Sequence, residues 1–284
     1  MSDIVYANVS HYNKIEASKY DNPSTLAISK VISSKILQFE DNSETSLRHD
    51  LPKYDQDRLL LTSDDDLTNV NNFWKKSGMS ILDFACGTGL ISQHLFPYCK
   101  QIVGIDVSQD MVDVYNEKFR KMNIPKERAC AYVLSLDDLD GNGDEPFSTE
   151  FDAVVCSMAY HHIKDLQEVT NKLSKLLKPN GRLFVADLIK GGDTFHGNLH
   201  PDEIAKLGVA HHGGFTPQSI LNLFKNASLS NAEVIGKAQA NVWVDEAKYQ
   251  RSTQSKDAKT LDLANGEKLY EVKLQLMVIS GIKT

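Results

Sequence analysis

The sequence predicts an α/β fold of three layers, in which helices cover both faces of a mostly parallel sheet. The first observation is a regular alternation of short apolar runs with amphipathic stretches from Ser80 onward, which is typical of repeated βαβ units. The second is composition: hydrophobic residues make up 41% and charged residues 24% of the 284 residues. This is ordinary globular usage and disfavours disorder, collagen or coiled coil.

Five apolar runs are predicted to be parallel strands: Ile81–Ala85, Ile102–Val107, Ala129–Leu134, Phe151–Ala159 and Arg182–Asp187. The amphipathic stretches between them are predicted to be helices: Leu90–Phe96, Gln109–Met122 and Leu166–Leu177. The last helix is expected to stop at Lys178-Pro179-Asn180-Gly181, because proline cannot continue a helix and glycine tolerates left-handed φ.

The C-terminal third adds one helix and two strands. Thr216 is expected to be the N-cap and Pro217 the first residue of a helix that runs to about Ala227. The strands are predicted at Ala232–Ile235 and Leu269–Ile282, with a polar stretch between them. Seven strands are therefore expected in all.

The residues before Ser80 divide into two parts. Apolar side chains at helical spacing predict a helix over Pro23–Phe39. The stretch from Asp41 to Gly78 loses this pattern, and nine acids against three bases give residues 40–66 a net charge of −6. We therefore predict an N-terminal helical segment over residues 1–40, an acidic, partly mobile insertion or lid over 41–78, and the core over 79–284.

Charge and cysteine usage restrict the class of protein. The net charge is −7, whereas nucleic-acid-binding domains are normally basic, so no nucleic-acid partner is expected. No apolar run approaches the roughly 20 residues of a membrane span, and the first 21 residues contain no signal-peptide core. The four cysteines include no C-x-x-C pair, so we expect free thiols and a cytoplasmic location.

A small-residue loop after the first strand is the main candidate for a ligand site. Asp83 lies at a strand end, Gly87 and Gly89 follow it, and Asp106 ends the next strand 17 residues after Gly89. Small residues allow the backbone to approach a ligand, and the second acid is well placed to accept hydrogen bonds from ribose hydroxyls.

The details of this loop disfavour a nicotinamide cofactor. Ser92 stands where the dinucleotide fingerprint G-x-G-x-x-G has its third glycine. Asp83 would also sit badly beside a pyrophosphate but well beside an ammonium group. The plain alternative is an ordinary strand-to-helix turn, which the joint register of glycines and acids disfavours. The expected ligand is a cationic amino acid joined to a nucleoside.

Over roughly residues 80–187 the chain resembles the class I S-adenosylmethionine-dependent methyltransferases of the ubiquinone/menaquinone-biosynthesis type. Asp83–Gly89 resembles the first motif, with Ala85 where glycine is common, and Gly104–Ser108 with Met111 resembles the second. The resemblance implies a Rossmann-like seven-stranded sheet whose last strand is antiparallel. It also implies S-adenosylmethionine as cofactor, S-adenosylhomocysteine as product, and an N-terminal helical segment that covers the cofactor.

The resemblance also implies individual roles. Asp83 would bind the amino-acid end of the cofactor, Asp106 the ribose, Val107 and Met111 the adenine faces, and Asp137 the adenine amino group. Leu134–Asp138 permits two registers, so Asp138 competes with Asp137. The full set of expected cofactor-binding residues is Tyr20, Asp83, Ala85, Gly87, Gly89, Asp106, Val107, Met111, Leu136, Asp137 and Ser157.

The acceptor is expected beyond the fourth strand. His161 or His162 could take a proton from the nucleophile, or both could shape the pocket and cap the next helix. The expected substrate-binding residues are Tyr160, His211, His212 and Phe215. Four histidines between positions 196 and 212 invite a metal, but glycine and asparagine interrupt them and no cysteine lies nearby. We predict no metal.

The predicted reaction is an in-line methyl transfer to a small-molecule acceptor through oxygen, nitrogen or carbon, by a monomer or a homodimer. One alternative is a catalytically silent cofactor-binding partner subunit. Another is a protein or tRNA methyltransferase, which the acidic charge disfavours because phosphate contacts need clustered lysine and arginine. Ser157-Met158-Ala159-Tyr160 also replaces the Asn-Pro-Pro-Tyr type of motif that amide- and base-modifying members usually carry.

Overall fold

A computed structural model describes residues 3–12, 17, 19–39, 70–75, 78–140, 150–192, 201–251, 258–263 and 266–284. Residues 41–69 of the predicted acidic insertion lie outside this part of the chain. Among the described helices, none combines the length and apolarity that crossing a membrane requires.

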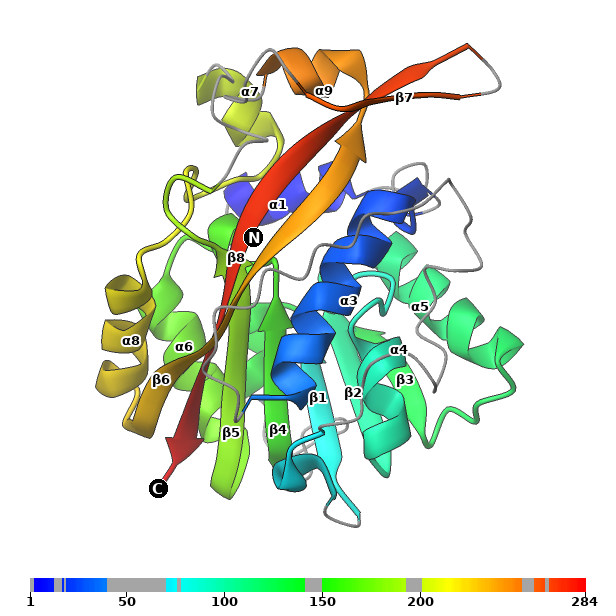
Figure 1. Ribbon diagram of the computed structural model, residues 1–284. Coiled ribbons are helices and arrows are strands. Elements are labelled where there is room, and N and C mark those ends of the chain that lie inside the picture. The colour runs from blue at the N-terminus through cyan, green and yellow to red at the C-terminus, as the bar shows by residue number, and fades with distance from the viewer. Residues whose placement is uncertain are drawn as a thin grey trace.

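One mixed sheet organises the chain (Figure 1). Its strands follow the order β3-β2-β1-β4-β5-β8-β6, and the short β7 pairs with β8 off this path. The first five strands are parallel, and β8 runs antiparallel between β5 and β6. The predicted mostly parallel sheet with an antiparallel last strand is confirmed, and in the part of the chain that the structure describes β7 adds an eighth strand to the seven that were expected. The bounds are β1 Ser80–Phe84, β2 Gln101–Asp106, β3 Ala129–Val133, β4 Phe151–Ser157, β5 Leu177–Leu188, β6 Leu229–Val244, β7 Thr260–Asp262 and β8 Lys268–Lys283.

Two strands are longer than their sequence predicts. β5 begins at Leu177 instead of Arg182, because the backbone passes Asn180 at φ 62 and rejoins β4 across a register shift. Helix α6 (Leu166–Lys175) thus ends before the prolyl stretch that was expected to stop it, and residues 178–181 lie within β5. β6 extends from Leu229 to Val244, because pairing with β8 continues far beyond its apolar run.

Helices cover both faces of the sheet, which confirms the three layers (Figure 1). On one face lie α3 (Pro23–Leu37), α4 (Ser92–Leu95) and α5 (Gln109–Lys121), and on the other lie α6 (Leu166–Lys175) and α8 (Pro217–Asn226). At the carboxyl end of the parallel strands lie α1 (Asp3–His11) and α7 (Pro201–Lys206), and α9 (Glu246–Arg251) follows β6. The 3-10 turns are η2 Asn72–Lys75, η3 Phe96–Tyr98, η4 Leu136–Asp140 and η5 Tyr160–His162.

Side-chain caps explain where the main helices begin. The Thr216 side chain accepts a hydrogen bond from the Ser219 N–H at the start of α8, as predicted. Ser108 caps α5 in the same way, and Asn22 caps α3 through a reciprocal capping box. These caps satisfy N–H groups that the first helical turn leaves without a partner.

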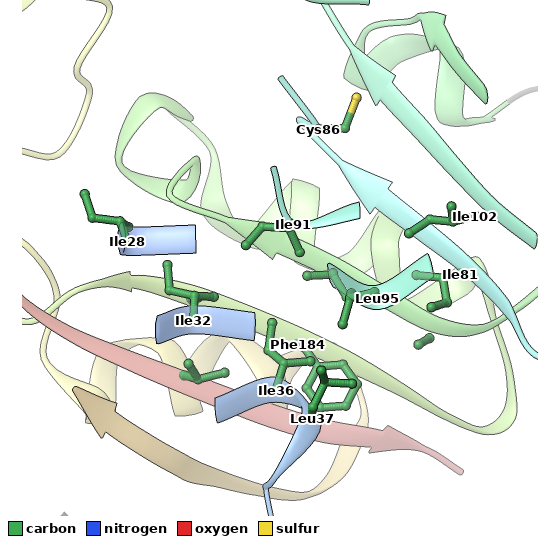
Figure 2. Packing of buried hydrophobic residues seen from close by; sticks show 14 of the residues in the cluster. Ile28, Ile32, Ile36, Leu37, Ile81, Cys86, Ile91, Leu95, Ile102 and Phe184 are labelled. Carbon is green, nitrogen blue, oxygen red and sulfur yellow. The ribbon is translucent and has the colours of Figure 1, made fainter. Parts of the chain in front are cut away.

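Helix α3 is part of the main hydrophobic core. Ile32 and Ile36 are at most 1% exposed, and Figure 2 shows them on the side of α3 that faces Phe184 of β5. Burial of one such side chain contributes roughly 1.5–3 kcal/mol. This packing fixes α3 on the sheet, so the residues just before it have a rigid support.

Candidate cofactor and acceptor site

The loop after β1 has a backbone that glycine makes possible. Ala85, Gly87 and Gly89 have φ values of 56°, 51° and 82°, in the left-handed region that ordinary side chains avoid. A Cβ on Gly89 would lie 2.6 Å from the ring of Tyr115, so this position admits only glycine. At Gly87 the nearest atom to a Cβ would be on Tyr20, at 3.9 Å, so Tyr20 lies over the loop.

Asp106 holds this loop from the end of β2. Its carboxylate oxygens accept hydrogen bonds from the Gly87 and Ser108 N–H groups, each at 2.9 Å. Burial raises the pKa of Asp106, although these backbone donors act in the opposite direction. Parallel pairing of β1 and β2 brings Asp83, Gly87, Gly89 and Asp106 together, as the sequence predicts.

Asp83 is 1% exposed at the end of β1. It accepts a hydrogen bond of 2.6 Å from the Ser92 hydroxyl, which accepts one of 3.1 Å from the Tyr115 hydroxyl. Burial, with a smaller contribution from Asp106, raises the pKa of Asp83 to about 7. No described lysine or arginine is among the groups that shift the pKa of Asp83 or Asp106. Two acidic side chains in this setting fit a cationic ligand.

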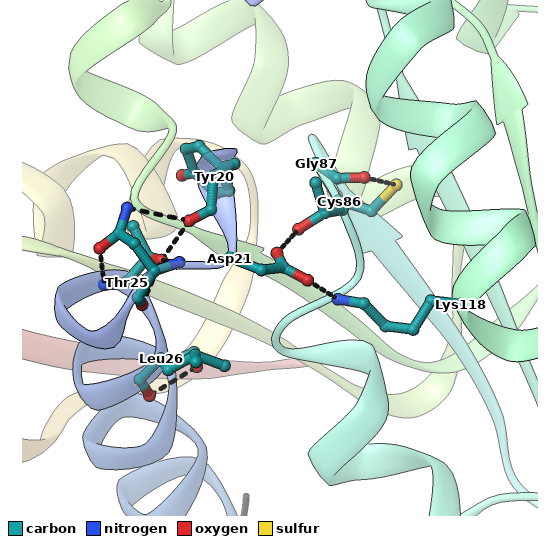
Figure 3. A network of polar contacts seen from close by, with 10 residues as sticks. Tyr20, Asp21, Thr25, Leu26, Cys86, Gly87 and Lys118 are labelled. Carbon is teal, nitrogen blue, oxygen red and sulfur yellow. Dashed lines mark hydrogen bonds and ion pairs between the residues drawn. The ribbon is translucent and has the colours of Figure 1, made fainter. Parts of the chain in front are cut away.

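The segment before α3 reaches the glycine loop. Figure 3 shows Asp21 between the start of α3 and Lys118 of α5. Asp21 accepts a hydrogen bond of 2.5 Å from the Thr88 hydroxyl and pairs with the Lys118 ammonium at 2.7 Å. Burial, Asp106 and Asp21 raise the pKa of the neighbouring Tyr20 to about 12, so its phenol stays protonated.

His161 forms a buried pair with Asp187 at the tips of β4 and β5. His161 Nδ1 lies 2.8 Å from Asp187 Oδ1, and the two side chains are 7% and 1% exposed. Because a carboxylate can only accept, Nδ1 is the donor in this contact. Asp187 also accepts from the backbone N–H groups of His161 and Leu188, which fixes its orientation.

His162 contacts the N-terminal segment instead. Its Nδ1 donates to the Gly208 carbonyl at 3.0 Å, and its Nε2 lies 3.2 Å from the Tyr12 hydroxyl. The Tyr12 carbonyl in turn accepts from the Ser108 hydroxyl at 2.7 Å. These contacts join the region around α1 to η5 and to the start of α5.

The other predicted cofactor-binding residues differ in how deeply their side chains are buried. Val107 is half-buried just after β2, and Met111 is buried in the first turn of α5. Ser157 is half-buried at the end of β4, and Leu136 is half-buried in η4. Asp137 is exposed in η4. Its neighbour Asp138 accepts hydrogen bonds from the N–H and hydroxyl of Ser135 at 2.6 and 2.7 Å.

Three of the four predicted substrate-binding residues lie near the His161–Asp187 pair. The N–H of His211 donates to the His161 carbonyl at 2.9 Å, and a backbone bridge holds Phe215 beside the end of β5. His212 is exposed next to them. The Tyr160 side chain instead lies in the second core with its hydroxyl 3.0 Å from Thr170 Oγ1, so the structure does not bring it together with the others.

No cluster of three potential metal ligands occurs among the residues that the structure describes. His196 and His200, from the histidine-rich stretch, lie outside them.

A protein family described as a methyltransferase domain matches residues 82–183, which hold the glycine loop, Asp106 and both histidines of η5. Residues 82–183 thus carry a class I S-adenosylmethionine-dependent methyltransferase domain. The resemblance inferred from the sequence motifs is therefore confirmed.

Known proteins similar to this methyltransferase include the ubiquinone biosynthesis O-methyltransferase of Xanthomonas oryzae pv. oryzae. It is 26% identical over 183 residues, which are 63% of this chain and 73% of the relative. The enzyme of the same name from Coxiella burnetii is 26% identical over 113 residues, or 39% and 44% of the two chains. The structure of the YcgJ protein from Bacillus subtilis covers 73% of this chain and 93% of its own, with a TM-score of 0.54 and 18% identity. That structural likeness supports the fold alone.

Sequence reasoning missed several polar residues of the methyltransferase site. Asp187 was assigned only to a strand. Its place at a strand end, like the places of Asp83 and Asp106, was a usable signal. Tyr12 and Asp21 were noted within the N-terminal segment without a role, and Lys118 was not considered. Their partners lie 150 and 97 residues away, so no local pattern could have identified these contacts.

Proposed function

We propose that this methyltransferase methylates a hydroxyl oxygen of a small molecule, with His161 as general base. The observation that carries the proposal is the buried His161–Asp187 pair with its 2.8 Å contact at the tips of β4 and β5. A carboxylate that holds the Nδ1 proton leaves Nε2 as the basic atom, as in other histidine bases.

A neutral hydroxyl is a weak nucleophile and must lose its proton as the new bond forms. The S-adenosylmethionine sulfonium supplies the methyl group: its C–S bond breaks as the C–O bond to the acceptor forms. His161 would take the hydroxyl proton on Nε2, and Asp187 would stabilise the resulting imidazolium. General-base assistance of this kind contributes about 10²–10⁴-fold in rate.

The cofactor would bind along the ends of β1 and β2. Asp106 is the candidate for the ribose hydroxyls, Asp83 for the amino-acid ammonium, and the loop from Ala85 to Gly89 for close backbone contact. The N-terminal segment with Tyr20 would cover this site and exclude water, which strengthens electrostatic contacts around the reacting atoms.

Two further observations support the hydroxyl acceptor and the choice of His161 as base, respectively. The similar Xanthomonas and Coxiella enzymes are named as O-methyltransferases. Within the described residues, both ring nitrogens of His162 are engaged by the Gly208 carbonyl and Tyr12, so His162 is better suited to hold the N-terminal segment than to act as base.

The cysteines are free thiols, which supports the proposed cytoplasmic location.

The test is S-adenosylhomocysteine formation with matched acceptors that carry a phenol, an aniline or a thiol on the same ring. We expect turnover with the phenol, and a His161→Gln variant that loses about 10²–10⁴-fold in kcat and the acidic limb of its pH profile. His162→Gln should keep that limb. Full turnover by His161→Gln would refute the general base, and preference for the aniline would refute the hydroxyl acceptor.

A further inference from the structure

We propose that Asp21 is a positioning residue for the cofactor, acting through Thr88 and Lys118 to fix the shape of the glycine loop. It would not touch the cofactor itself. The inference rests on the proposed function in one respect, namely that this loop contacts S-adenosylmethionine.

Asp21 is attached to a rigid part of the molecule. The next residue, Asn22, is the N-cap of α3 and accepts hydrogen bonds from the N–H groups of Ser24 and Thr25. The Thr25 hydroxyl also bonds back to the Tyr20 carbonyl. Because α3 packs on the sheet through its buried isoleucines, the backbone at Asp21 is held relative to β1 and its loop.

Thr88 links this support to the loop. It is fully buried, and its hydroxyl donates to Asp21 Oδ1 at 2.5 Å. Its neighbours Gly87 and Gly89 both have positive φ, and glycine has little intrinsic preference among conformations. External contacts must therefore define the loop. Asp106 holds Gly87 from β2, and Asp21 holds Thr88 from the N-terminal segment.

Lys118 connects the same carboxylate to α5. Its ammonium lies 2.7 Å from Asp21 Oδ2, and its side chain is 17% exposed. Burial lowers the pKa of Lys118, while the Asp21 carboxylate acts in the opposite direction and favours the charged ammonium. Tyr115 and Phe119 of α5 lie against Gly89. The side chains of Asp21, Thr88 and Lys118 thus join the N-terminal segment, the glycine loop and α5 at one point.

The first experiment is a calorimetric titration of the full chain with S-adenosylhomocysteine. Asp21→Ala and Thr88→Val should each bind about tenfold more weakly, as expected for loss of one charge-assisted hydrogen bond. Thr88→Ser keeps the hydroxyl and should bind like the natural chain. Glu117→Ala is the matched control, because Glu117 pairs with Arg120 on the exposed side of α5.

Kinetics and double variants separate positioning from general stability. With a turned-over acceptor, Asp21→Ala should raise KM for S-adenosylmethionine about tenfold while kcat at saturation stays within about twofold. The Asp21→Ala, Thr88→Val pair should bind no more weakly than Asp21→Ala alone, because Asp21→Ala already removes the hydrogen bond that Thr88→Val removes. Asp21→Ala with Lys118→Met removes the unpaired ammonium and should not recover affinity.

Three outcomes would overturn the inference while leaving the proposed function intact: natural affinity in Asp21→Ala, recovery of affinity by Lys118→Met, or an equal loss in Thr88→Ser and Thr88→Val. If the natural chain itself binds no S-adenosylhomocysteine, the cofactor site is refuted first and the role of Asp21 with it.

Discussion

The raised pKa of Asp83 predicts how the stability of the ligand-free chain depends on pH. Burial raises this pKa from 3.8 to about 7. Below pH 3.8 the carboxyl is protonated in both the folded and the unfolded chain. Between pH 3.8 and about 7 the unfolded chain loses this proton while the folded chain keeps it, so stability falls as pH rises. Above about pH 7 the loss is complete.

The magnitude follows from the same two values. Their difference, about 7 minus 3.8, is roughly 3, and each pKa unit corresponds to about 1.4 kcal/mol, so the loss reaches at most about 4 kcal/mol. Asp83→Asn does not titrate, and its amide oxygen can still accept from the Ser92 hydroxyl. Relative to the natural chain, the variant should therefore gain up to about 4 kcal/mol of stability between pH 4 and pH 8.

The assay is urea unfolding of both chains without ligand at half-unit pH steps, because subtraction removes the titration of all other groups. Asp138→Asn is a matched control: Asp138 is exposed, and hydrogen bonds from Ser135 lower its pKa, so its difference should be flat above about pH 4.5. A difference for Asp83→Asn that stays within about 0.5 kcal/mol from pH 4.5 to 8 would refute the reasoning.

Three substitutions test other parts of the fold and site. Gly89→Ala places a Cβ 2.6 Å from the Tyr115 ring at φ +82° and should cost about 1–3 kcal/mol in thermal unfolding, with loss of S-adenosylhomocysteine binding. Ile32→Ala, at 1% exposure, should cost about 2–5 kcal/mol without changing ligand affinity in the folded fraction. Asp106→Ala leaves the Gly87 N–H without its acceptor and should cost about 1–3 kcal/mol as well as abolishing binding, as measured by calorimetry. A melt unchanged in any of the three would contradict the packing described.

The sequence predicts the layers and most elements of this fold because their signals are local. Apolar periodicity locates α3 and α5 to within two residues, and Thr216 marks the start of α8 through its own cap. The length of β6 was missed. Its outer residues are alternately polar and apolar, which is itself typical of a half-buried strand, and β8 pairs with them.

The same difference between local signals and distant contacts applies to the site. Asp83, Gly87 and Asp106 could be predicted as neighbours, because carboxyl ends of adjacent parallel strands meet at one edge of a sheet. The partner of His161 could not, since Asp187 is 26 residues away and its side chain could have faced either side of β5. Tyr160 was predicted to contact the acceptor because the tip of the fourth strand faces the substrate in the similar methyltransferases, but its side chain lies in the core beside Thr170.

The hydrogen bonds of Asp106 decide whether one side chain can hold both the loop and a ribose. Each carboxylate oxygen can accept two hydrogen bonds, and the backbone groups of Gly87, Ser108 and Val107 are the donors that face this carboxylate. One of the four acceptor positions is thus available to a ribose hydroxyl without loss of a backbone contact. The loop then needs no rearrangement to bind, so the ordering cost of binding is small and the glycine loop is expected to keep its shape when S-adenosylhomocysteine is added.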